Sequence, residues 1–346
     1  MTMADWRLCV APMIDVTDRH CRYFHRLLAP EARLYTEMIT TGALLHGDVA
    51  RHLDFDASEH PVALQLGGSE PDALAKCAKL GESWGYDEIN LNCGCPSERV
   101  QQGSFGACLM AEPQLVADCV RAMQDAVSVP VTVKHRLGLD YDDSYAFVRD
   151  FVGVLYQAGC RVFIVHARNA VLKGLSPKDN REKPPLRYSS VLQLKRDFPD
   201  CTIVLNGGLS DVDTCRAWQD QLDGIMLGRA AWHQPDILSA LSADGLMGRQ
   251  SAALDDDEGR QVLLQFLEYV QHHHARGVPL HIMVRGLLGW RTGRPGARRW
   301  RQMLSDSKAL RAQGPDLLLQ AWDTLVDTAA QDFRAIAGSS DGQSRI

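Results

Sequence analysis

The stretch INLNCGCPS, Ile89–Ser97, begins as a buried β-strand and ends on two cysteines, a proline and a serine. Successive side chains of a strand point to opposite faces, so Asn92 is predicted to face inward and Cys93 to face outward toward covering helices. Cys95 lies past the end of the strand, where the following Pro96 restricts the backbone. The stretch therefore predicts a strand that presents Asn92 and Cys95 at its C-terminal end.

Two cysteines one residue apart also suggest a metal or redox site. A structural zinc site needs four ligands, commonly as two CxxC pairs, and Cys93 and Cys95 have neither that spacing nor a second pair nearby. The sequence contains no CxxC redox motif. We therefore predict no metal site, a packing role for Cys93 and a chemical role for Cys95.

Similar β-rich runs recur along the chain, with amphipathic helical segments between them. Strands are predicted at RLCVAPM (from Arg7), LYTEMI (from Leu34), PVALQLG (from Pro61), DEINLNCG (from Asp87), PVTVKHR (from Pro130), RVFIVHAR (from Arg161), TIVLNGG (from Thr202) and DGIMLGRA (from Asp223). Eight strands that alternate with helices predict an α/β fold, a (β/α)8 TIM barrel. The rival is an open doubly wound sheet, which usually has fewer strands, and no GxGxxG follows the first strand.

Polar residues and glycines gather at the C-terminal ends of these strands, where TIM barrels carry their active sites. In chain order the ends are Pro12 and Met13, Glu37, Gln65, Asn92, Lys134, His166, the run Asn206, Gly207 and Gly208, and the pair Gly228 and Arg229. The last two ends predict a phosphate cradle, because glycines let the backbone approach a ligand and an arginine adds charge. Simple turn glycines are the alternative.

Lys134 lies in an apolar strand, where an unpaired charge is costly. It is a lysine at the barrel rim that reaches solvent, a Schiff-base nucleophile, or a cation beside an anionic cofactor. Arg136 follows two positions later and so shares its face. The residues alone leave these three alternatives open.

The barrel pattern stops after Leu241, and helical runs follow a polar stretch. We predict a barrel domain over residues 1–245, a small all-helical domain over 250–335 and a disordered tail over 336–346. No apolar run approaches the roughly 18 residues that a membrane span needs, and the N-terminus shows no export signal. We therefore expect a cytoplasmic protein without membrane contact, and a monomer.

A formal net charge of -6 argues against a uniformly basic nucleic-acid binder, but the charge is unevenly distributed. Residues 276–311 hold eight arginines and one lysine against a single acidic residue, Asp306. Trp290 and Trp300 are interleaved with these arginines, an arrangement that suits phosphates and unstacked bases. The alternative is that both tryptophans belong to a core.

Together, VAPM, VALQLGG, INLNCGCPS, VTVKHRLG, HAR, NGG and LGR resemble, over nearly the whole chain, the dihydrouridine synthases, which reduce uridine in tRNA. YTEMITTGALLHG, GLSPKDNREKPPLRY and PGARRWR resemble the DusA branch, which acts on positions 20 and 20a. Cys93 stands where many members carry an apolar residue. The resemblance implies an oxidoreductase with bound FMN, NADPH as reductant and a helical domain that grips tRNA.

The resemblance also implies roles for individual residues. The positions that correspond to flavin-binding residues are Pro12, Met13, Gln65, Lys134, His166, Asn206, Gly207, Gly208, Gly228 and Arg229, and Cys95 corresponds to the proton donor. Lys178, Arg181, Arg294 and Arg298 correspond to the region used for tRNA contact, and Asn92 is expected to hold the uracil edge.

The implied chemistry suits these residue types. The C5=C6 bond of uracil is conjugated to the C4 carbonyl, so C6 can accept a hydride from reduced flavin and C5 then needs a proton. An unperturbed thiol has a pKa of about 8.5 and is mostly protonated at neutral pH, so Cys95 can act as an acid. Lys134 supplies a fixed cation where reduced flavin carries negative charge.

Three other functions remain possible on the residues alone. One is a small-molecule FMN oxidoreductase resembling dihydroorotate dehydrogenases, which leaves the arginine-rich extension unexplained. Another is a Schiff-base aldolase that uses Lys134, and the third is a non-catalytic RNA-binding barrel that needs neither Lys134 nor Cys95. A yellow purified protein favours the flavin-dependent functions.

Overall fold

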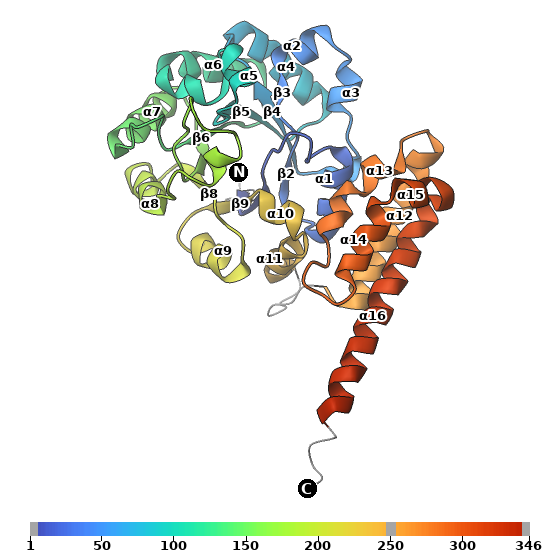
Figure 1. Ribbon diagram of the computed structural model, residues 1–346. Coiled ribbons are helices and arrows are strands. Elements are labelled where there is room, and N and C mark those ends of the chain that lie inside the picture. Colours follow the sequence, from blue (N-terminus) through green and yellow to red (C-terminus); the bar gives the residue numbers. More distant parts are fainter. Residues whose placement is uncertain (1–5, 247–253, 341–346) are drawn as a thin grey trace. The chain divides into compact units, whose positions relative to one another are not determined.

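The computed structural model describes residues 6–246 and 254–340, which form two compact units (Figure 1). The first unit comprises the described residues up to Arg22 together with Glu31–Gly228. The second comprises Tyr23–Pro30 together with the described residues from Arg229 onward. Helix α1 (Arg19–Leu28) therefore contributes residues to both units.

The first unit is a closed ring of eight parallel strands (Figure 1). They are β1 (Leu8–Val10), β2 (Arg33–Tyr35), β4 (Val62–Gly67), β5 (Glu88–Cys93), β6 (Val131–Arg136), β7 (Val162–His166), β8 (Thr202–Asn206) and β9 (Gly224–Leu227). The ring closes because β1 pairs with both β2 and β9 while β2 also pairs with β4. A short strand, β3 (Ile39–Thr40), pairs with the end of β4. The predicted TIM barrel is confirmed.

Helices surround the ring of strands (Figure 1). Those of the first unit, besides the start of α1, are α2 (Thr41–His46), α3 (Val49–Leu53), α4 (Pro71–Trp84), α5 (Glu98–Gln102), α6 (Pro113–Ala126), α7 (Tyr145–Gln157), α8 (Tyr188–Asp197) and α9 (Val212–Gln219), with 3-10 turns η2 (Ala57–Glu59), η3 (Gly106–Ala111) and η4 (Asp179–Arg181). Both α4 and α6 begin with proline, which suits a first turn because its N–H would have no helical partner. Both lie where the sequence predicted helices.

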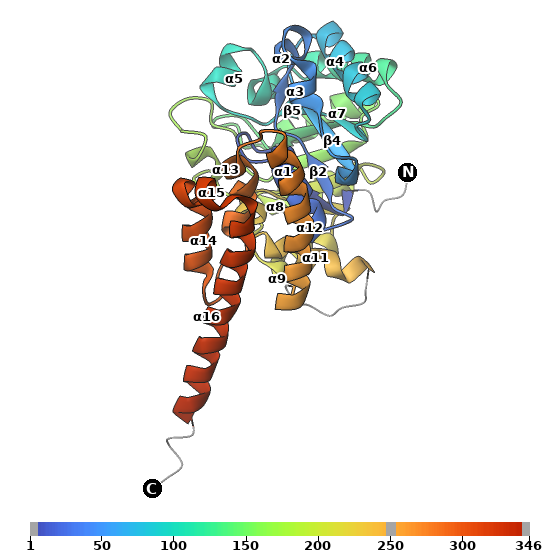
Figure 2. The same cartoon turned by 90° about the vertical axis from the view of Figure 1, so that its right-hand side faces the viewer.

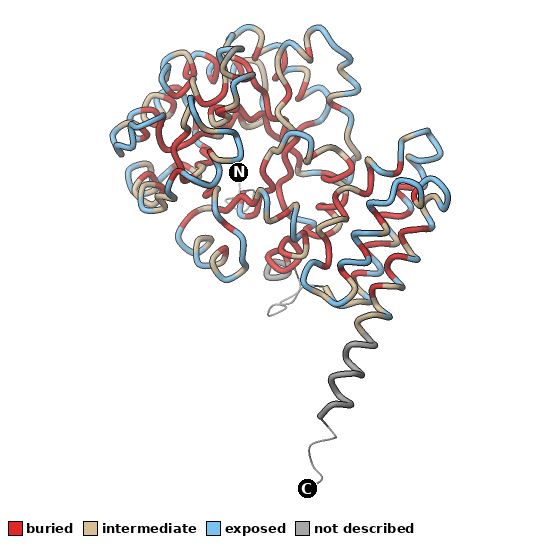
Figure 3. Tube along the Cα trace, in the orientation of Figure 1, coloured by how far each residue is buried: buried red, intermediate tan, exposed pale blue. Residues whose placement is uncertain are grey.

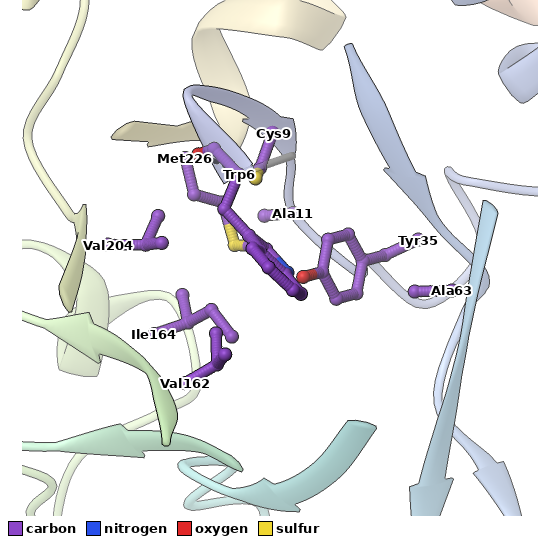
Figure 4. Close-up of a cluster of buried hydrophobic side chains, with 9 residues drawn as sticks. All are labelled: Trp6, Cys9, Ala11, Tyr35, Ala63, Val162, Ile164, Val204 and Met226. Carbon is purple, nitrogen blue, oxygen red and sulfur yellow. Dashed lines mark hydrogen bonds between the residues drawn. The ribbon is translucent and has the colours of Figure 1, made fainter. Parts of the chain in front are cut away.

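Apolar side chains from different strands fill the barrel interior (Figure 4). The cluster contains Trp6, Cys9, Ala11, Tyr35, Ala63, Val162, Ile164, Val204 and Met226. Burying one aliphatic side chain of this size stabilises the fold by ~1.5–3 kcal/mol. The strands are buried along their length, whereas the surrounding helices alternate buried and exposed residues (Figure 3).

The second unit is helical apart from its connections. Besides Tyr23–Pro30 it contains α10 (Arg229–His233), α11 (Asp236–Leu246), α12 (Asp256–Ala275), α13 (Leu280–Met283), η5 (Val284–Gly289), α14 (Ala297–Ser305), α15 (Ser307–Gln313), η6 (Gly314–Asp316) and α16 (Leu317–Ser340). Helices α14 and α16 run side by side (Figure 2). Helix α16 continues through residues 336–340, which the sequence analysis assigned to a tail, and 341–346 lie outside the described residues.

Three tryptophans form the core of this second unit. Trp290, Trp300 and Trp322 are each at most 1% exposed, with ring centroids 5.1–6.0 Å apart. Trp300 also donates from Nε1 to the Leu287 carbonyl, 2.8 Å away. The hypothesis that Trp290 and Trp300 stack on RNA bases is therefore wrong, because both side chains are fully buried in this core.

Helix α12 begins with a capping box that the sequence analysis treated only as a polar stretch. The Asp255 side chain accepts from the Glu258 backbone N–H, and the Glu258 side chain accepts from the Asp255 backbone N–H. Acidic residues in the first turn of a helix also stabilise it, because their negative charge interacts favourably with the positive end of the helix dipole. No helix in the described ranges combines the length and apolar content needed to cross a membrane.

Candidate active site at the barrel mouth

Four predicted site residues meet at the C-terminal ends of neighbouring strands. Asn92 on β5 is in register with Lys134 on β6, and His166 on β7 is in register with Asn206 on β8. The Lys134 ammonium donates to Asn206 Oδ1 at 3.1 Å, and Asn206 Nδ2 donates to the Met226 carbonyl at 2.7 Å. The strand register thus brings these side chains to one edge of the barrel interior, as the sequence predicted.

Lys134 lies in a positive environment that disfavours its own charge. Burial, and then the neighbouring Arg136 guanidinium, lower the pKa of Lys134 to about 7. Among the described residues, no carboxylate forms an ion pair with Lys134, and its hydrogen-bond partner is the neutral Asn206 amide. The rim-lysine alternative does not describe this side chain, which is partly buried inside the barrel mouth.

Arg136 fastens two loops at this edge. Its side chain is 3% exposed and donates from Nε to the Gly94 carbonyl at 3.2 Å. From one terminal nitrogen it also donates to the carbonyls of Asn169 and Asn180, at 3.1 and 2.9 Å. Burial lowers the pKa of Arg136 to about 10, yet the group stays charged at neutral pH. The strand period predicted Arg136 on the same face as Lys134 but indicated no role for it.

His166 is neutral at pH 7. Burial and the positive charges of Arg136 and Lys134 lower the pKa of His166 well below its ordinary value. A neutral imidazole can donate one hydrogen bond and accept another.

The cations and glycines of the site suit an anionic ligand. Lys134 and Arg136 are two cations with only neutral recorded partners in the described chain, so a bound anion offsets the cost of burying them. Gly207 and Gly208 follow β8 with φ values of 104° and 75°, and a Cβ at Gly207 would lie 2.5 Å from a His166 ring carbon. These residues fit the group that the resemblance implies.

The remaining predicted flavin-binding residues differ in exposure. Gln65 is 1% exposed and bonds to the side chains of Asn90 and Asn92. Pro12 and Met13 are partly buried after β1, where the Met13 carbonyl accepts from the following turn. Gly228 ends β9, and Arg229 is exposed as the first residue of α10.

The two cysteines of the opening stretch have different environments. Cys93 is fully buried and burial raises its pKa well above the ordinary value, as expected of a packing residue. Cys95 is only partly buried, and its backbone is held on both sides. Its N–H donates to Asn92 Oδ1 at 3.0 Å and its carbonyl accepts from Ala107 at 2.9 Å. Its thiol contacts the Ser97 hydroxyl at 3.5 Å.

The basic residues predicted to contact RNA fall into two groups. Lys178 and Arg181 are exposed on the loop between β7 and α8, whose turns are organised by the buried Asn180. Arg298 is exposed on α14.

Arg294 is partly buried and donates to Asp256 Oδ1 and to the Leu254 carbonyl, each at 2.9 Å. Its neighbour Arg291 is fully buried and also pairs with Asp256. Part of the arginine-rich stretch therefore stabilises the helical unit.

In the described chain, no group of three or more histidine, cysteine, aspartate or glutamate side chains is placed to hold a metal ion.

A closed parallel barrel whose strand ends carry a thiol, a lysine and a histidine is the architecture of a TIM-barrel enzyme. The model of the dihydrouridine synthase family matches residues 9–328. The chain belongs to this family and is therefore an oxidoreductase.

Three similar proteins carry the name tRNA-dihydrouridine(20/20a) synthase. The protein of Pseudomonas putida is 58% identical over 299 residues, which cover 86% of this chain and 88% of that protein. That of Xanthomonas campestris pv. campestris is 54% identical over 323 residues, 93% and 95% of the two chains. That of Vibrio vulnificus is 52% identical over 316 residues, 91% and 95% of the two chains.

Proposed function

We propose that this chain reduces uridine to 5,6-dihydrouridine at positions 20 and 20a in the D-loop of tRNA, with bound FMN and with NADPH as reductant. The observation that carries the proposal is a partly exposed thiol, Cys95, at the end of the strand that pairs with the Lys134 strand. The names of the similar proteins support the tRNA positions. The resemblance described above supports FMN and NADPH.

The barrel mouth would hold FMN through a small set of residues. Lys134, Arg136 and neutral His166 offer donors to its anionic and carbonyl groups, and Gly207 and Gly208 let the backbone approach its phosphate. Pro12, Met13, Gln65, Asn206, Gly228 and Arg229 complete the proposed set. When bound in its reduced form, FMN supplies the hydride that C6 of uracil accepts.

Cys95 acts as the acid in this proposal. Hydride addition at C6 leaves negative charge spread over C5 and the C4 carbonyl, and protonation at C5 completes the reduction. The fixed backbone of Cys95 positions its thiol, which contacts the Ser97 hydroxyl. The thiolate left after proton transfer to C5 regains its proton from solvent water. Lys134 would supply a cation where reduced flavin carries negative charge.

Binding of tRNA is proposed to use the exposed basic residues. Taking the target base out of its stack costs a few kcal/mol, so contacts elsewhere on the RNA must offset that cost. Lys178, Arg181 and Arg298 are exposed and can contact phosphates. Arg294 contributes less, because its guanidinium already donates to Asp256 and Leu254.

Mapping dihydrouridine in tRNA tests the whole proposal. A deletion strain should lack dihydrouridine at positions 20 and 20a, and a plasmid copy of the wild-type chain should restore it. The purified protein should be yellow, and Lys134→Ala should lose most of the flavin absorbance. Unchanged dihydrouridine in the deletion strain would contradict the proposed substrate. A colourless protein that is trapped on a carbonyl substrate by borohydride would instead support the aldolase alternative.

A further inference from the structure

A line of polar side chains runs through the barrel interior along the inner face of β5. Glu88, Asn90 and Asn92 alternate on this strand, with Gln65 beside them on β4 and Thr132 on β6. All five are at most 9% exposed, and Glu88, Asn90 and Thr132 are fully buried. Burying this many polar groups is costly unless each is hydrogen-bonded, so their pattern of bonds is under tight constraint.

The five side chains form one continuous chain of hydrogen bonds. Asn92 Nδ2 donates to Gln65 Oε1 at 2.8 Å, and Gln65 Nε2 donates to Asn90 Oδ1 at 2.7 Å. Asn90 Nδ2 then donates to the Thr132 hydroxyl at 2.7 Å, which donates to Glu88 Oε1 at 2.5 Å. We call these five residues the interior chain. It joins the first residue of β5 to the barrel mouth.

The Glu88 carboxylate sets the direction of every bond in the interior chain. An ionised carboxylate only accepts, and Glu88 also accepts from Trp6 Nε1 and the Tyr35 hydroxyl, each at 2.8 Å. The Arg33 guanidinium forms an ion pair with the same carboxylate, with 3.3 Å between Nη1 and Oε2. Thr132 must therefore donate toward Glu88 and accept from the amide of Asn90.

The same direction then passes through the three amides. Asn90 gives its N–H to Thr132 and so presents oxygen to Gln65. Gln65 must therefore donate an N–H to the Asn90 oxygen, which leaves its own oxygen to accept from Asn92. Each amide has a donor side and an acceptor side, so the orientation of one determines the orientation of the next.

At the barrel mouth, the partners of Asn92 independently require the same donor-to-acceptor direction along the interior chain. Asn92 Oδ1 accepts from two backbone N–H groups, those of Gly94 at 3.1 Å and Cys95 at 3.0 Å. Backbone N–H groups only donate, so they require oxygen at this position. The Glu88 carboxylate at one end and the two backbone N–H donors at the other thus require the same orientation of all three side-chain amides.

We propose that Glu88 and Thr132 are positioning residues for the proton donor, acting through Asn90, Gln65 and Asn92 on the backbone of Cys95. The inference rests on the proposed function, in which Cys95 protonates uracil. Neither Glu88 nor Thr132 touches the substrate. Their role is to keep the Asn92 oxygen turned toward the Gly94 and Cys95 amides, and thereby to hold the thiol in place.

The interior chain also determines what Asn92 can offer a ligand. Both lone pairs of its oxygen are occupied by the Gly94 and Cys95 amides, and one N–H is given to Gln65. The group left for a ligand is the second N–H. Asn92 therefore selects an acceptor such as a uracil carbonyl oxygen, and a donor such as the ring N3–H finds no partner there.

Two pairs of variants separate this role from general stability. Thr132→Val keeps the shape but removes the hydroxyl, and Thr132→Ser restores the hydroxyl in a smaller side chain. Glu88→Gln replaces the acceptor-only group by an amide that can also donate. Tyr35→Phe removes another bond to the same carboxylate without interrupting the interior chain. Thr132→Val leaves the Arg33–Glu88 ion pair intact, so it remains informative if Glu88→Gln fails to fold.

The primary measurement is hydrogen exchange of the Gly94 and Cys95 amides in the full-length protein, followed by mass spectrometry of peptides that cover them. We expect Thr132→Val and Glu88→Gln to exchange these amides at least fivefold faster, while Thr132→Ser and Tyr35→Phe stay within twofold of wild type. In tRNA reduction, the same two variants should lower kcat at least fivefold with KM for tRNA within twofold.

Two results would overturn the inference. One is wild-type exchange and kcat in folded Thr132→Val. The other is an equal effect of Tyr35→Phe and Thr132→Val, which would indicate loss of packing alone. Failure of the proposed function is distinguishable, because wild-type protein would then form no dihydrouridine while the exchange measurement would still decide whether the interior chain holds the Cys95 backbone.

Discussion

Cys93 and Cys95 are separated by one glycine, yet their surroundings give them opposite chemical character. Cys93 points to the outward side of β5 and is fully buried there. Burial raises the pKa of its thiol well above the ordinary value. Cys95 lies past the strand end, partly exposed, with its backbone bonded to Asn92 and Ala107. The thiol of Cys93 thus packs in the core, whereas that of Cys95, two residues later, is accessible and is the proposed proton donor.

Replacement of each cysteine by alanine should separate these roles. We expect Cys95→Ala to lower kcat for dihydrouridine formation at least 100-fold while flavin content and the Kd for tRNA change less than twofold. Cys93→Ala should retain turnover but lose about 1 kcal/mol of stability, as is common for small deletions in a core. Single-turnover assays and denaturant unfolding measure the two effects. Normal turnover by Cys95→Ala would show that another group supplies the proton.

Lys134 should make flavin affinity depend on pH. Its pKa of about 7 in the flavin-free barrel means that the ammonium is present below pH 7 and is lost as pH rises. An anionic ligand favours the charged form and raises that pKa, so binding takes up a proton above pH 7. The Kd for FMN should therefore increase between pH 7 and 9, by at most tenfold per pH unit, and stay level from pH 6 to 7.

Variants at Lys134 isolate this contribution. Lys134→Arg carries a charge throughout the range and should bind FMN with a Kd that is flat from pH 7 to 9. Lys134→Met should bind weakly, and its profile shows any titration of the flavin itself. Fluorescence titration of apoprotein with FMN supplies the values. If wild type and Lys134→Met have parallel profiles, Lys134 is not the titrating group.

Strand periodicity is why so much of the site could be predicted residue by residue. The alternation of side chains placed Asn92 inside the barrel and Cys93 outside, and the structure confirms both. The roles of Glu88 and Thr132 escaped prediction because their partners lie on other strands. Which polar residues of one strand bond to which of the next depends on register, and no local pattern gives it.

At the scale of elements, α14 combines a core face and a basic face in one short helix. Ala297, Trp300 and Leu304 are buried at helical spacing, while Arg298 and Arg301 are exposed between them. The density of arginines favoured an RNA contact for Trp300, with a core position as the alternative. The spacing of three and four residues was the available signal that Trp300 faces the core.

The exposed face of α14 should contribute to tRNA affinity through charge. Charge reversal in Arg298→Glu is expected to weaken tRNA binding about tenfold at 100 mM salt and to make the salt dependence of Kd shallower, with a change in slope of about one. Arg149→Glu makes the same charge change on α7 and should have little effect. Filter-binding or anisotropy titrations at several salt concentrations provide the comparison. Equal effects of the two variants would mean that only net charge matters.

At the scale of the whole molecule, the boundary between the two units could not be predicted from composition. The expected barrel ended at residue 245, but contacts group the described residues from Arg229 onward with Tyr23–Pro30, a segment near the N-terminus. Tyr23 stacks on Tyr269 with ring centroids 3.9 Å apart, and Phe24 contacts Phe266 and Trp290 edge-on. Such long-range partners leave no trace in local sequence patterns, whereas the count of β-runs predicted the barrel itself.

A chain truncated after residue 246 should therefore not fold into a stable isolated barrel. Truncation removes Phe266, Tyr269 and Trp290, so Phe24, which is fully buried, would become exposed to water. Loss of a buried aromatic contact costs ~3–5 kcal/mol, comparable with the total stability of many domains. We expect the truncated chain to unfold at lower temperature than the full chain and to bind a hydrophobic dye such as ANS.

Phe24→Ser provides the matched control for this explanation. In the full chain the substitution should lower the unfolding temperature, because it leaves a cavity and an unpaired hydroxyl beside Phe266. In the truncated chain it should instead reduce dye binding and improve solubility, because the exposed ring is what binds the dye. Phe24→Ser is thus harmful in the full chain and beneficial in the truncated one only if the C-terminal helices are what bury Tyr23–Pro30. A truncated chain as stable as the full one, with no dye binding, would show that this segment is covered by the barrel alone.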